Sequence, residues 1–180
     1  MDTQLELATG FKGQQVRPGD AGYDEGRTVI NAMIDKRPAL IVRPTGAADV
    51  IDAVNLAREH GLPVGIRCGG HSVAGNGVCD GGIQLDLSSL KGVQVDVGAR
   101  RARANAGVLW GEFDRETQLF GLATPGGRVT TTGVGGFTTG GGYGWLSPKY
   151  GLTCDNLVAA DVVTADGNLV HASEDENADL

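Results

Sequence analysis

The sequence RCGGHSVAGNG, residues 67–77, places His71 inside a glycine-rich stretch. Glycine lets a backbone turn tightly and approach a ligand closely, and consecutive backbone N–H groups in such a loop can surround an anion. An imidazole at that position can act as a base, a metal ligand, a nucleophile or a purely structural side chain. The pattern therefore predicts an anion-binding loop with a histidine beside it.

A second glycine-rich stretch, TPGGRVTTTGVGGFTTGGGYG, covers residues 124–144. Two such stretches in one chain favour a single extended ligand held by backbone groups, such as a dinucleotide with its pyrophosphate. The glycine fingerprint of a Rossmann domain is not found between a strand and its helix, and the Walker lysine motif is missing. These observations disfavour a nicotinamide Rossmann domain and a phosphate-loop NTPase.

Composition narrows the function classes further. The formal net charge of −7 argues against a surface for nucleic acid or for an anionic membrane, and no apolar run reaches membrane-spanning length. The odd number of cysteines does not suggest a disulfide framework. Their spacing from the histidines does not suggest a metal site. We therefore expect a cytoplasmic protein without a metal, with Cys68, Cys79 and Cys154 as small buried residues.

The first half of the chain must position the loop that holds His71. Residues 39–42 and 63–67 read as strands, and residues 45–61 between them read as a helix capped by Thr45. We expect Ala47, Val50, Ile51, Val54 and Ala57 to form its inward face. A strand–helix–strand unit predicts parallel strands, and the loop from Cys68 then leaves the edge where such sheets bind ligands.

Near residue 90 the strand–helix–strand pattern gives way to short segments of alternating apolar and polar residues. Residues 83–87, 93–97 and 101–106 alternate like half-buried strands, with Asp86 and Asp96 on solvated faces. A helix should follow, with Leu109, Phe113 and Phe120 inward. The glycine-rich residues 124–144 should be mostly loop with one short helix. The end of the chain reads as a hairpin that turns at Asp166-Gly167.

Three ordered motifs carry a family resemblance: RCGGHSVAGNG, GGIQLDLSSLKGVQVD and GVGGFTTGGGYGWLSPKYGLTCDNL. Together they resemble the FAD domain of the berberine-bridge-enzyme-like oxidoreductases, within the wider vanillyl-alcohol oxidase and p-cresol methylhydroxylase (PCMH) fold. The resemblance implies an α+β, PCMH-type FAD-binding domain of two α/β subdomains. Residues 1–90 would form the first, a small parallel βαβ unit, and residues 91–180 would begin the second, a mostly antiparallel sheet.

The resemblance also implies roles for the two glycine-rich stretches. Residues 67–73 would hold the FAD pyrophosphate, and a neutral ring nitrogen of His71 would bond covalently to the flavin 8α-methyl. Val129 stands where many relatives have a second, cysteinyl attachment, so one covalent bond is expected. Phe137 replaces a family histidine. Thr132, beside the flavin, would leave a path open for dioxygen. The full set of expected cofactor residues is Arg67, Cys68, Gly69, Gly70, His71, Ser72, Val73, Asn76, Gly127, Thr131, Thr132, Gly135, Gly136, Thr139, Gly142, Tyr143, Asn156 and Val158.

Other side chains have plainer expected roles. His60 and His171 should be surface residues. Tyr143 and Trp145 would either pack on the adenine or fill the core, and the sequence does not separate these alternatives.

The activity implied by the resemblance is oxidation of a small-molecule C–H by hydride transfer to FAD, with dioxygen as the electron acceptor. The substrate pocket and the catalytic base would lie beyond residue 180, so the chain is expected to be an N-terminal fragment that is inactive and poorly stable alone. Two alternatives stay open: a dehydrogenase of the same fold that binds FAD without a covalent bond, and a non-catalytic flavin-binding remnant.

Overall fold

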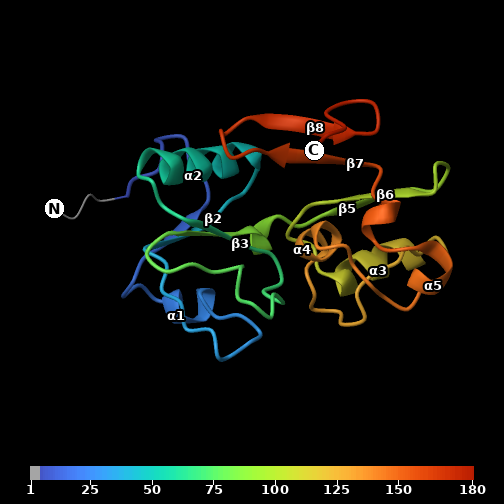
Figure 1. Cartoon of the computed structure of the whole chain (residues 1–180), viewed down its shortest axis with the longest axis horizontal. Helices are drawn as coiled ribbons and strands as arrows, with labels where there is room; N and C mark the ends of the chain where they lie inside the picture. Colours follow the sequence, from blue (N-terminus) through green and yellow to red (C-terminus); the bar gives the residue numbers. More distant parts are fainter. Residues whose placement is uncertain (1–4) are drawn as a thin grey trace. The chain divides into compact units, whose positions relative to one another are not determined.

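A computed structural model describes residues 5–180, which pack as two units (Figure 1). Unit 1 contains the chain up to Arg67, together with Ser72–Asp86 and Val158–Leu180, and unit 2 contains Cys68–His71 and Leu87–Leu157. Each unit therefore combines segments that are distant in sequence. The expected subdomains, residues 1–90 and 91–180, are consecutive instead, and their assignment as flavin-binding subdomains stays a prediction.

The elements of unit 1 are β1 (Gln14–Val16), α1 (Tyr23–Gly26), β2 (Leu40–Arg43), α2 (Ala47–Glu59), β3 (Val64–Arg67), β4 (Ile83–Asp86), β7 (Ala159–Val163) and β8 (Leu169–Ser173). Those of unit 2 are the 3₁₀ helix η1 (Leu87–Ser89), β5 (Val93–Asp96), β6 (Arg101–Ala104), α3 (Trp110–Gln118), α4 (Val134–Thr139), α5 (Ser147–Tyr150) and the 3₁₀ helix η2 (Cys154–Asn156).

The sheet of unit 1 has the strand order β1-β2-β4-β3. Strands β2 and β3 both run parallel to β4, while β1 pairs antiparallel with β2. The expected strand–helix–strand unit with parallel strands is therefore confirmed, with β4 inserted between β2 and β3. Carboxyl ends of parallel strands meet at one edge, so Arg43, Arg67 and Asp86 end three neighbouring strands.

Strand β4 corrects one expectation. Its alternating sequence IQLD predicts a half-buried strand, but all four residues are buried because β4 is the central parallel strand. The polar residues of β4 have protein partners instead of water. Gln84 donates from Nε2 to the carbonyl of Gly26 at 2.7 Å, and Asp86 pairs with two arginines. Alternation alone therefore does not distinguish a solvated face from a buried face whose polar groups are paired.

Helix α2 packs against β4 on one side and against β7 on another (Figure 1). The half-buried side chains of Val50, Ile51 and Val54 match the expected inward face in part, but Ala47 is exposed. The fully buried residues are Asp49, Ala53, Leu56 and Ala57. The second layer, the β7–β8 hairpin, explains the wider buried surface. The hairpin itself is antiparallel and turns through Gly167 at φ 82°, as predicted.

The predicted cap of α2 is wrong. Gly46 is the N-cap residue and no side chain caps the helix. Thr45 instead donates its hydroxyl to Asp49 Oδ2 at 2.7 Å.

Unit 2 is built around Trp110, which contacts Phe113 and Phe137 edge-to-face with ring centroids 5.3 and 5.5 Å away. The expected helix is present as α3, with Phe113 inward and Leu109 half-buried. Phe120 is 49% exposed, against expectation, because α3 ends at Gln118 and Phe120 lies beyond its buried face. The strands β5 and β6 form an antiparallel pair.

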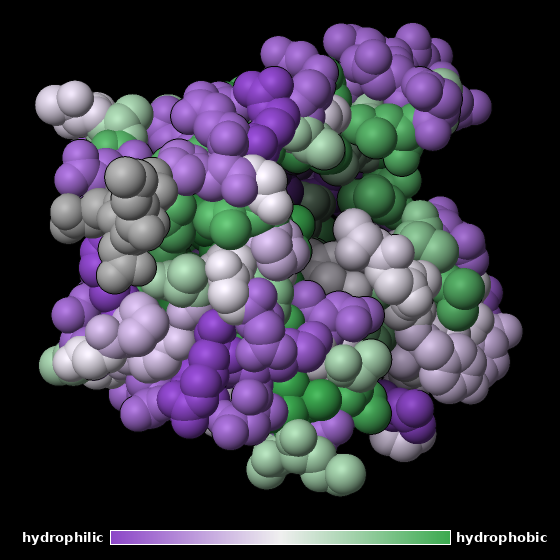
Figure 2. All heavy atoms as spheres, turned by 60° about the vertical axis from the view of Figure 1, so that its left-hand side comes forward, coloured by the Kyte–Doolittle hydropathy of each residue, from purple (hydrophilic) through white to green (hydrophobic). Residues whose placement is uncertain are grey.

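The second glycine-rich stretch is mostly loop, with α4 as its one short helix, as predicted. Hydrophobic residues also reach the surface of the molecule, shown green among purple hydrophilic residues in Figure 2. Within residues 5–180, no helix is long and apolar enough to cross a membrane.

Candidate functional site

His71 belongs to unit 2, where its half-buried imidazole lies against two threonine hydroxyls. Nε2 is 2.9 Å from Thr131 Oγ1, and Nδ1 is 3.4 Å from Thr132 Oγ1. In the described chain no carboxylate is hydrogen-bonded to this ring. The ring therefore lacks the carboxylate that usually orients a histidine base, and its two nitrogens face uncharged hydroxyl groups.

Two glycines let the loop reach this position. A side chain on Gly69 would collide with the amide nitrogen of Gly133 and the carbonyl of Thr131. A side chain on Gly133 would collide with Cys68 and with the amide of Gly69. The two backbones are in direct contact because neither residue has a Cβ, so the glycines of both motifs are required to place His71 beside the threonines.

The same loop offers free donors. Gly70 adopts φ 69°, and in the part of unit 2 that the structure describes the amides of Gly70 and His71 donate to no backbone or side-chain acceptor. In unit 1, the Ser72 hydroxyl accepts from the amide of Asn76 at 3.2 Å, and the Val73 carbonyl accepts from Asn31 Nδ2 at 2.8 Å. Unpaired loop amides of this kind bind phosphate oxygens.

Arg67 ends β3 in unit 1, and its charge is already paired. Its Nη1 lies 3.1 Å from Asp86 Oδ1, while Arg43 Nε lies 3.0 Å from the other carboxylate oxygen. The Asp86 side chain is 1% exposed. The expectation that Asp86 is solvated is therefore wrong, because two arginines replace water as its partners. Arg67 Nε is buried and has no hydrogen-bond partner among the described residues. A contact of Arg67 with pyrophosphate stays a prediction.

The remaining expected residues of the second glycine-rich stretch differ in their surroundings. Gly127 lies against the Trp110 ring, and a Cβ on Gly135 would come 2.9 Å from the Ala106 carbonyl. Gly142 adopts φ 78° and packs against Thr153. Gly136 has open space around it, and the Thr139 hydroxyl donates to the Gly135 carbonyl at 3.1 Å.

Two further expected residues lie near the end of this region. Asn156 in unit 2 uses its side-chain amide to bond the carbonyls of Tyr150 and Leu152 at 2.9 and 2.8 Å, so it holds its own loop. Val158 belongs to unit 1 and is 52% exposed. Contacts of either residue with a cofactor stay predictions.

Tyr143 and Trp145 do not fill the core, which removes one of their two expected roles. They are 56% and 78% exposed, and the Arg128 guanidinium lies 5.5 and 5.4 Å from their ring centroids. Stacking of this kind orders exposed aromatic rings. No sequence pattern singles out Arg128, since only the fold brings residue 128 and residues 143–145 together.

The cysteines differ from expectation as well. Cys154 is exposed, while Cys68 and Cys79 are half-buried, because Cys154 lies in the surface helix η2. Burial raises the pKa of the Cys68 thiol, and the nearby amides of Gly135 and Gly136 oppose this only in part. Cys68 is therefore a packed thiol and not a thiolate nucleophile. The described residues contain no group of histidine, cysteine and carboxylate side chains that could hold a metal ion.

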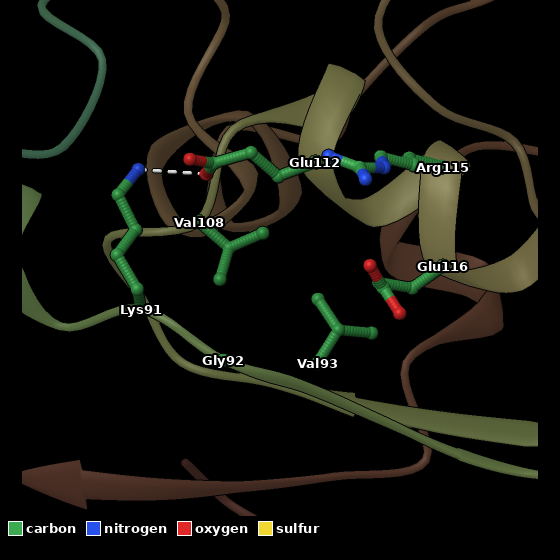
Figure 3. A pocket seen from close by; sticks show the side chains of 7 residues that line it. All are labelled: Lys91, Gly92, Val93, Val108, Glu112, Arg115 and Glu116. Atoms are coloured by element: carbon green, nitrogen blue, oxygen red, sulfur yellow. Dashed lines mark hydrogen bonds and ion pairs between the residues drawn. The ribbon is translucent and has the colours of Figure 1, made fainter.

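A cavity of about 230 Å³ also lies in unit 2, between β5 and α3 (Figure 3). Its lining residues are Lys91, Gly92, Val93, Val108, Glu112, Arg115 and Glu116. Lys91 Nζ is 2.7 Å from Glu112 Oε2, which also accepts from the amide of Leu109 at 2.8 Å at the start of α3. The polar groups of this pair stabilise the helix, and none of the expected cofactor residues lines the cavity.

Residues 38–173 match a family described as FAD binding domain. The chain is 37% identical over 180 residues to (R)-6-hydroxynicotine oxidase of Paenarthrobacter nicotinovorans, covering 100% of this chain and 39% of that protein. The crystal structure of 6-hydroxy-D-nicotine oxidase from Arthrobacter nicotinovorans matches with a TM-score of 0.91 at 37% identity, covering 98% of this chain and 38% of that one.

Two further structures are similar. BBE-like 1 of Physcomitrella patens matches with a TM-score of 0.87 at 31% identity, covering 92% of this chain and 36% of that one. Glucooligosaccharide oxidase from Acremonium strictum, described with a 6-S-cysteinyl, 8α-N1-histidyl FAD, matches with a TM-score of 0.87 at 34% identity, covering 93% and 36%. These matches confirm the expected α+β, PCMH-type fold. The chain spans less than two fifths of the length of these relatives, and it belongs to the FAD binding domain family whose members include the BBE-like FAD-linked oxidoreductases.

Proposed function

We propose that the full-length protein is an FAD-dependent oxidase in which FAD is bound covalently through His71. The observation that carries this proposal is the His71 imidazole, which two contacting glycine backbones hold against Thr131 and Thr132. Bound FAD would supply the hydride acceptor for oxidation of a small-molecule C–H bond. The substrate, the use of dioxygen as acceptor and a cytoplasmic location stay predictions.

The residues present fit such a cofactor. A Cβ on Gly69 or Gly133 would collide with the backbone of the other loop, so glycine at both positions keeps the loop that carries His71 against the two threonines. The unpaired amides of Gly70 and His71 are suitable donors for phosphate oxygens. Val129 offers no thiol at the position of the second attachment, which supports a single bond through His71.

His71 has the chemistry that a covalent attachment requires. A neutral imidazole nitrogen is a nucleophile. Among the described residues, the ring nitrogens are hydrogen-bonded to threonine hydroxyls and to no charged side chain. The surrounding threonines can exchange hydrogen bonds with either nitrogen, because a hydroxyl both donates and accepts. The bond would keep the cofactor in place through repeated cycles of reduction and reoxidation.

The test uses denatured full-length protein. A gel under denaturing conditions should retain flavin fluorescence, and peptide mass spectrometry should place one FAD on the peptide that holds His71. His71→Ala should remove the label. The other two histidines give matched controls, since His60→Ala and His171→Ala change surface residues and should leave the label intact. Release of all flavin from the denatured wild-type protein would refute covalent attachment, and would favour the alternative that FAD is bound without a covalent bond.

A further inference from the structure

We propose that Asn31 and Lys36 are positioning residues for the cofactor: they hold residues 72–78, which follow His71 in the chain, in the conformation that binds FAD. This inference rests on the cofactor binding proposed above, and it concerns two side chains outside the expected cofactor set. We call residues 31–37, which carry both side chains, the support segment. The support segment and residues 72–78 belong to unit 1.

Residues 72–78 form a loop that has only short turns of its own. The amide of Gly75 donates to the carbonyl of Ser72 at 3.0 Å, and the amide of Asn76 donates to the Ser72 hydroxyl at 3.2 Å. A loop held only by such turns has many accessible conformations, and ordering it when a ligand binds opposes binding. Contacts from outside the loop are therefore needed to keep it in one conformation beforehand.

Asn31 fixes the start of this loop through both ends of its side-chain amide. Its Oδ1 accepts from the amide of Met33 at 3.1 Å, and its Nδ2 donates to the carbonyl of Val73 at 2.8 Å. The first bond is a turn within the support segment, and it sets the orientation of the amide group, because the oxygen must face the N–H of Met33. The amino group of Asn31 consequently points at the Val73 carbonyl, which only a donor can satisfy.

Lys36 fixes the end of the loop with a charged donor. Its Nζ lies 3.1 Å from the carbonyl oxygen of Gly75 and 3.3 Å from that of Val78, and its side chain is half-buried. Hydrogen bonds from an ammonium group are stronger than those between neutral groups. One cation therefore ties together two carbonyls of the loop.

Packing and backbone bonds extend these contacts along the support segment. A Cβ on Gly75, whose φ is 70°, would come 2.7 Å from Cγ2 of Ile34, so glycine there lets the loop lie against the support segment. Further along the chain, the amide of Arg37 donates to Asp80 Oδ1 at 2.7 Å, and the amide of Gly81 donates to the Arg37 carbonyl at 2.8 Å. The support segment therefore contacts the loop and its continuation from end to end.

The support segment is itself anchored in unit 1. Arg27 bonds to the Asp35 carboxylate and donates to the carbonyl of Lys36 at 3.3 Å. Directly after the segment, the carbonyl of Pro38 accepts the Tyr23 hydroxyl at 2.7 Å. This anchoring matters because a hydrogen bond to a mobile partner would not reduce the number of loop conformations. The loop is thus held in one conformation before any cofactor binds, which raises affinity.

This role has a kinetic consequence that a purely structural role lacks. Loss of a loop contact should raise the FAD concentration needed for half-maximal covalent incorporation. The maximal rate at saturating FAD should be unchanged, since the His71 ring is hydrogen-bonded to Thr131 and Thr132 and not to the support segment. A purely structural role would instead reduce the amount of folded protein and leave the half-saturating concentration of the folded fraction as it is.

The test measures the rate of covalent flavin incorporation against FAD concentration in full-length apoprotein. Asn31→Asp keeps the side-chain shape and the acceptor for Met33, but places a carboxylate oxygen against the Val73 carbonyl. Lys36→Met removes the ammonium group at similar length. Each should raise the half-saturating FAD concentration about tenfold, as expected for one lost orienting hydrogen bond. Asn31→Ala removes the donor without adding a repulsive oxygen, so its effect should be smaller than that of Asn31→Asp.

Matched controls make the same chemical changes elsewhere in unit 1. Asn177 also donates its side-chain amide to a backbone carbonyl, that of His171 at 2.6 Å, and Lys12 is an exposed lysine. Asn177→Asp and Lys12→Met should leave the half-saturating FAD concentration unchanged. The effect of Asn31→Asp should persist at high salt, which screens long-range repulsion between an added carboxylate and the cofactor phosphates.

The outcomes separate this inference from the proposed function. Circular dichroism shows which variants fold, and the exposed contact of Asn31 carries the test by itself if Lys36→Met does not fold. A wild-type half-saturating concentration in the folded Asn31→Asp variant overturns the inference and leaves covalent attachment intact. An effect of Asn31→Ala as large as that of Asn31→Asp also overturns it, because packing and not the donor would then be decisive.

Failure of the proposed function gives a different result. If the wild-type protein binds FAD without a covalent bond, covalent attachment is refuted, and the same variants are compared by their dissociation constants for FAD. A roughly tenfold weaker affinity of Asn31→Asp would still support the positioning role, and an unchanged affinity would overturn it. Wild-type protein that binds no FAD overturns both.

Discussion

Thr132 combines two properties at one position beside His71: a small half-buried side chain and a hydroxyl 3.4 Å from Nδ1. A β-branched side chain of this size leaves more space than leucine. We therefore expect dioxygen to reach a reduced flavin bound at this site, which would make the full-length protein an oxidase.

Thr132→Leu adds bulk at this contact and should slow reoxidation by dioxygen about tenfold or more, while reduction by substrate changes less. The measurement is stopped-flow mixing of reduced full-length protein with aerated buffer. Thr132→Val keeps the size and serves as the control, with reoxidation near the wild-type rate. Equal reoxidation rates for the leucine and valine variants would show that Thr132 does not control access.

For individual side chains, the sequence predicts which residues come together only where a motif specifies them. The two motifs singled out His71, Thr131 and Thr132 as cofactor residues, and the structure brings these three side chains together; their contacts with a cofactor stay predictions. The Arg43–Asp86–Arg67 pairing was not predictable, since it depends on the register that puts three strand ends side by side. The contact of Arg128 with Tyr143 and Trp145 likewise depends on how one loop folds back on another.

Among the elements, α2 depends on a buried carboxylate in its first turn. Asp49 accepts from the amide of Lys12 at 3.0 Å and from the amide and hydroxyl of Thr45, each at 2.7 Å. Burial raises the pKa of this carboxyl, but the three hydrogen bonds outweigh burial and hold the pKa below its usual value. The charged form is therefore the one that joins the N-terminal segment to the helix.

This shift predicts a pH dependence. A carboxyl whose folded-state pKa is lowered stabilises the fold fully above its unfolded pKa of about 3.9. That contribution is lost as pH falls through the lower folded-state pKa. Asp49→Asn should lower the free energy of unfolding at pH 7 by about 2 kcal/mol and flatten its decline below about pH 4. Urea unfolding followed by circular dichroism from pH 3 to pH 7 checks this, and parallel pH profiles for the two proteins would contradict it.

The contact between the two glycine-rich loops gives a second prediction. Gly133→Ala places a methyl group against Cys68 and Gly69. The backbone must shift to avoid this collision, which should lower the free energy of unfolding by about 1–3 kcal/mol. It should also lower covalent flavin incorporation, because the backbone that positions His71 must move. Gly10→Ala is the control, since Gly10 has nothing within 4 Å of the added carbon. A Gly133→Ala protein with wild-type stability and flavin content would show that the close contact is dispensable.

Element types were largely predictable because local patterns decide them: the helix in residues 45–61, the strands on either side of it and the final hairpin all form. Their burial was less predictable. The inward face of α2 and the full burial of β4 depend on the second layer and on strand order, which are properties of the whole sheet.

For the whole molecule, the exposed hydrophobic side chains have a direct consequence. Ile66 on the edge strand β3 is 59% exposed, and unpaired strand edges with exposed apolar residues promote association. We expect the 180-residue chain expressed alone to self-associate. Light scattering coupled to size-exclusion chromatography should show species larger than a monomer, and Ile66→Lys should reduce them. A strictly monomeric chain at micromolar concentration would refute this expectation.

The return of the last hairpin to unit 1 also sets an order for biosynthesis. The ribosome releases β2, α2, β3 and β4 early, but the face of α2 that packs on β7 stays bare until residues 159–163 have left the exit tunnel. During that interval all of Leu87–Leu157 is translated. The last layer of unit 1 can therefore pack only after the whole inserted segment has been synthesised. Slow translation of the glycine-rich residues 124–144 would lengthen the time for which this face of α2 is exposed to chaperones and proteases.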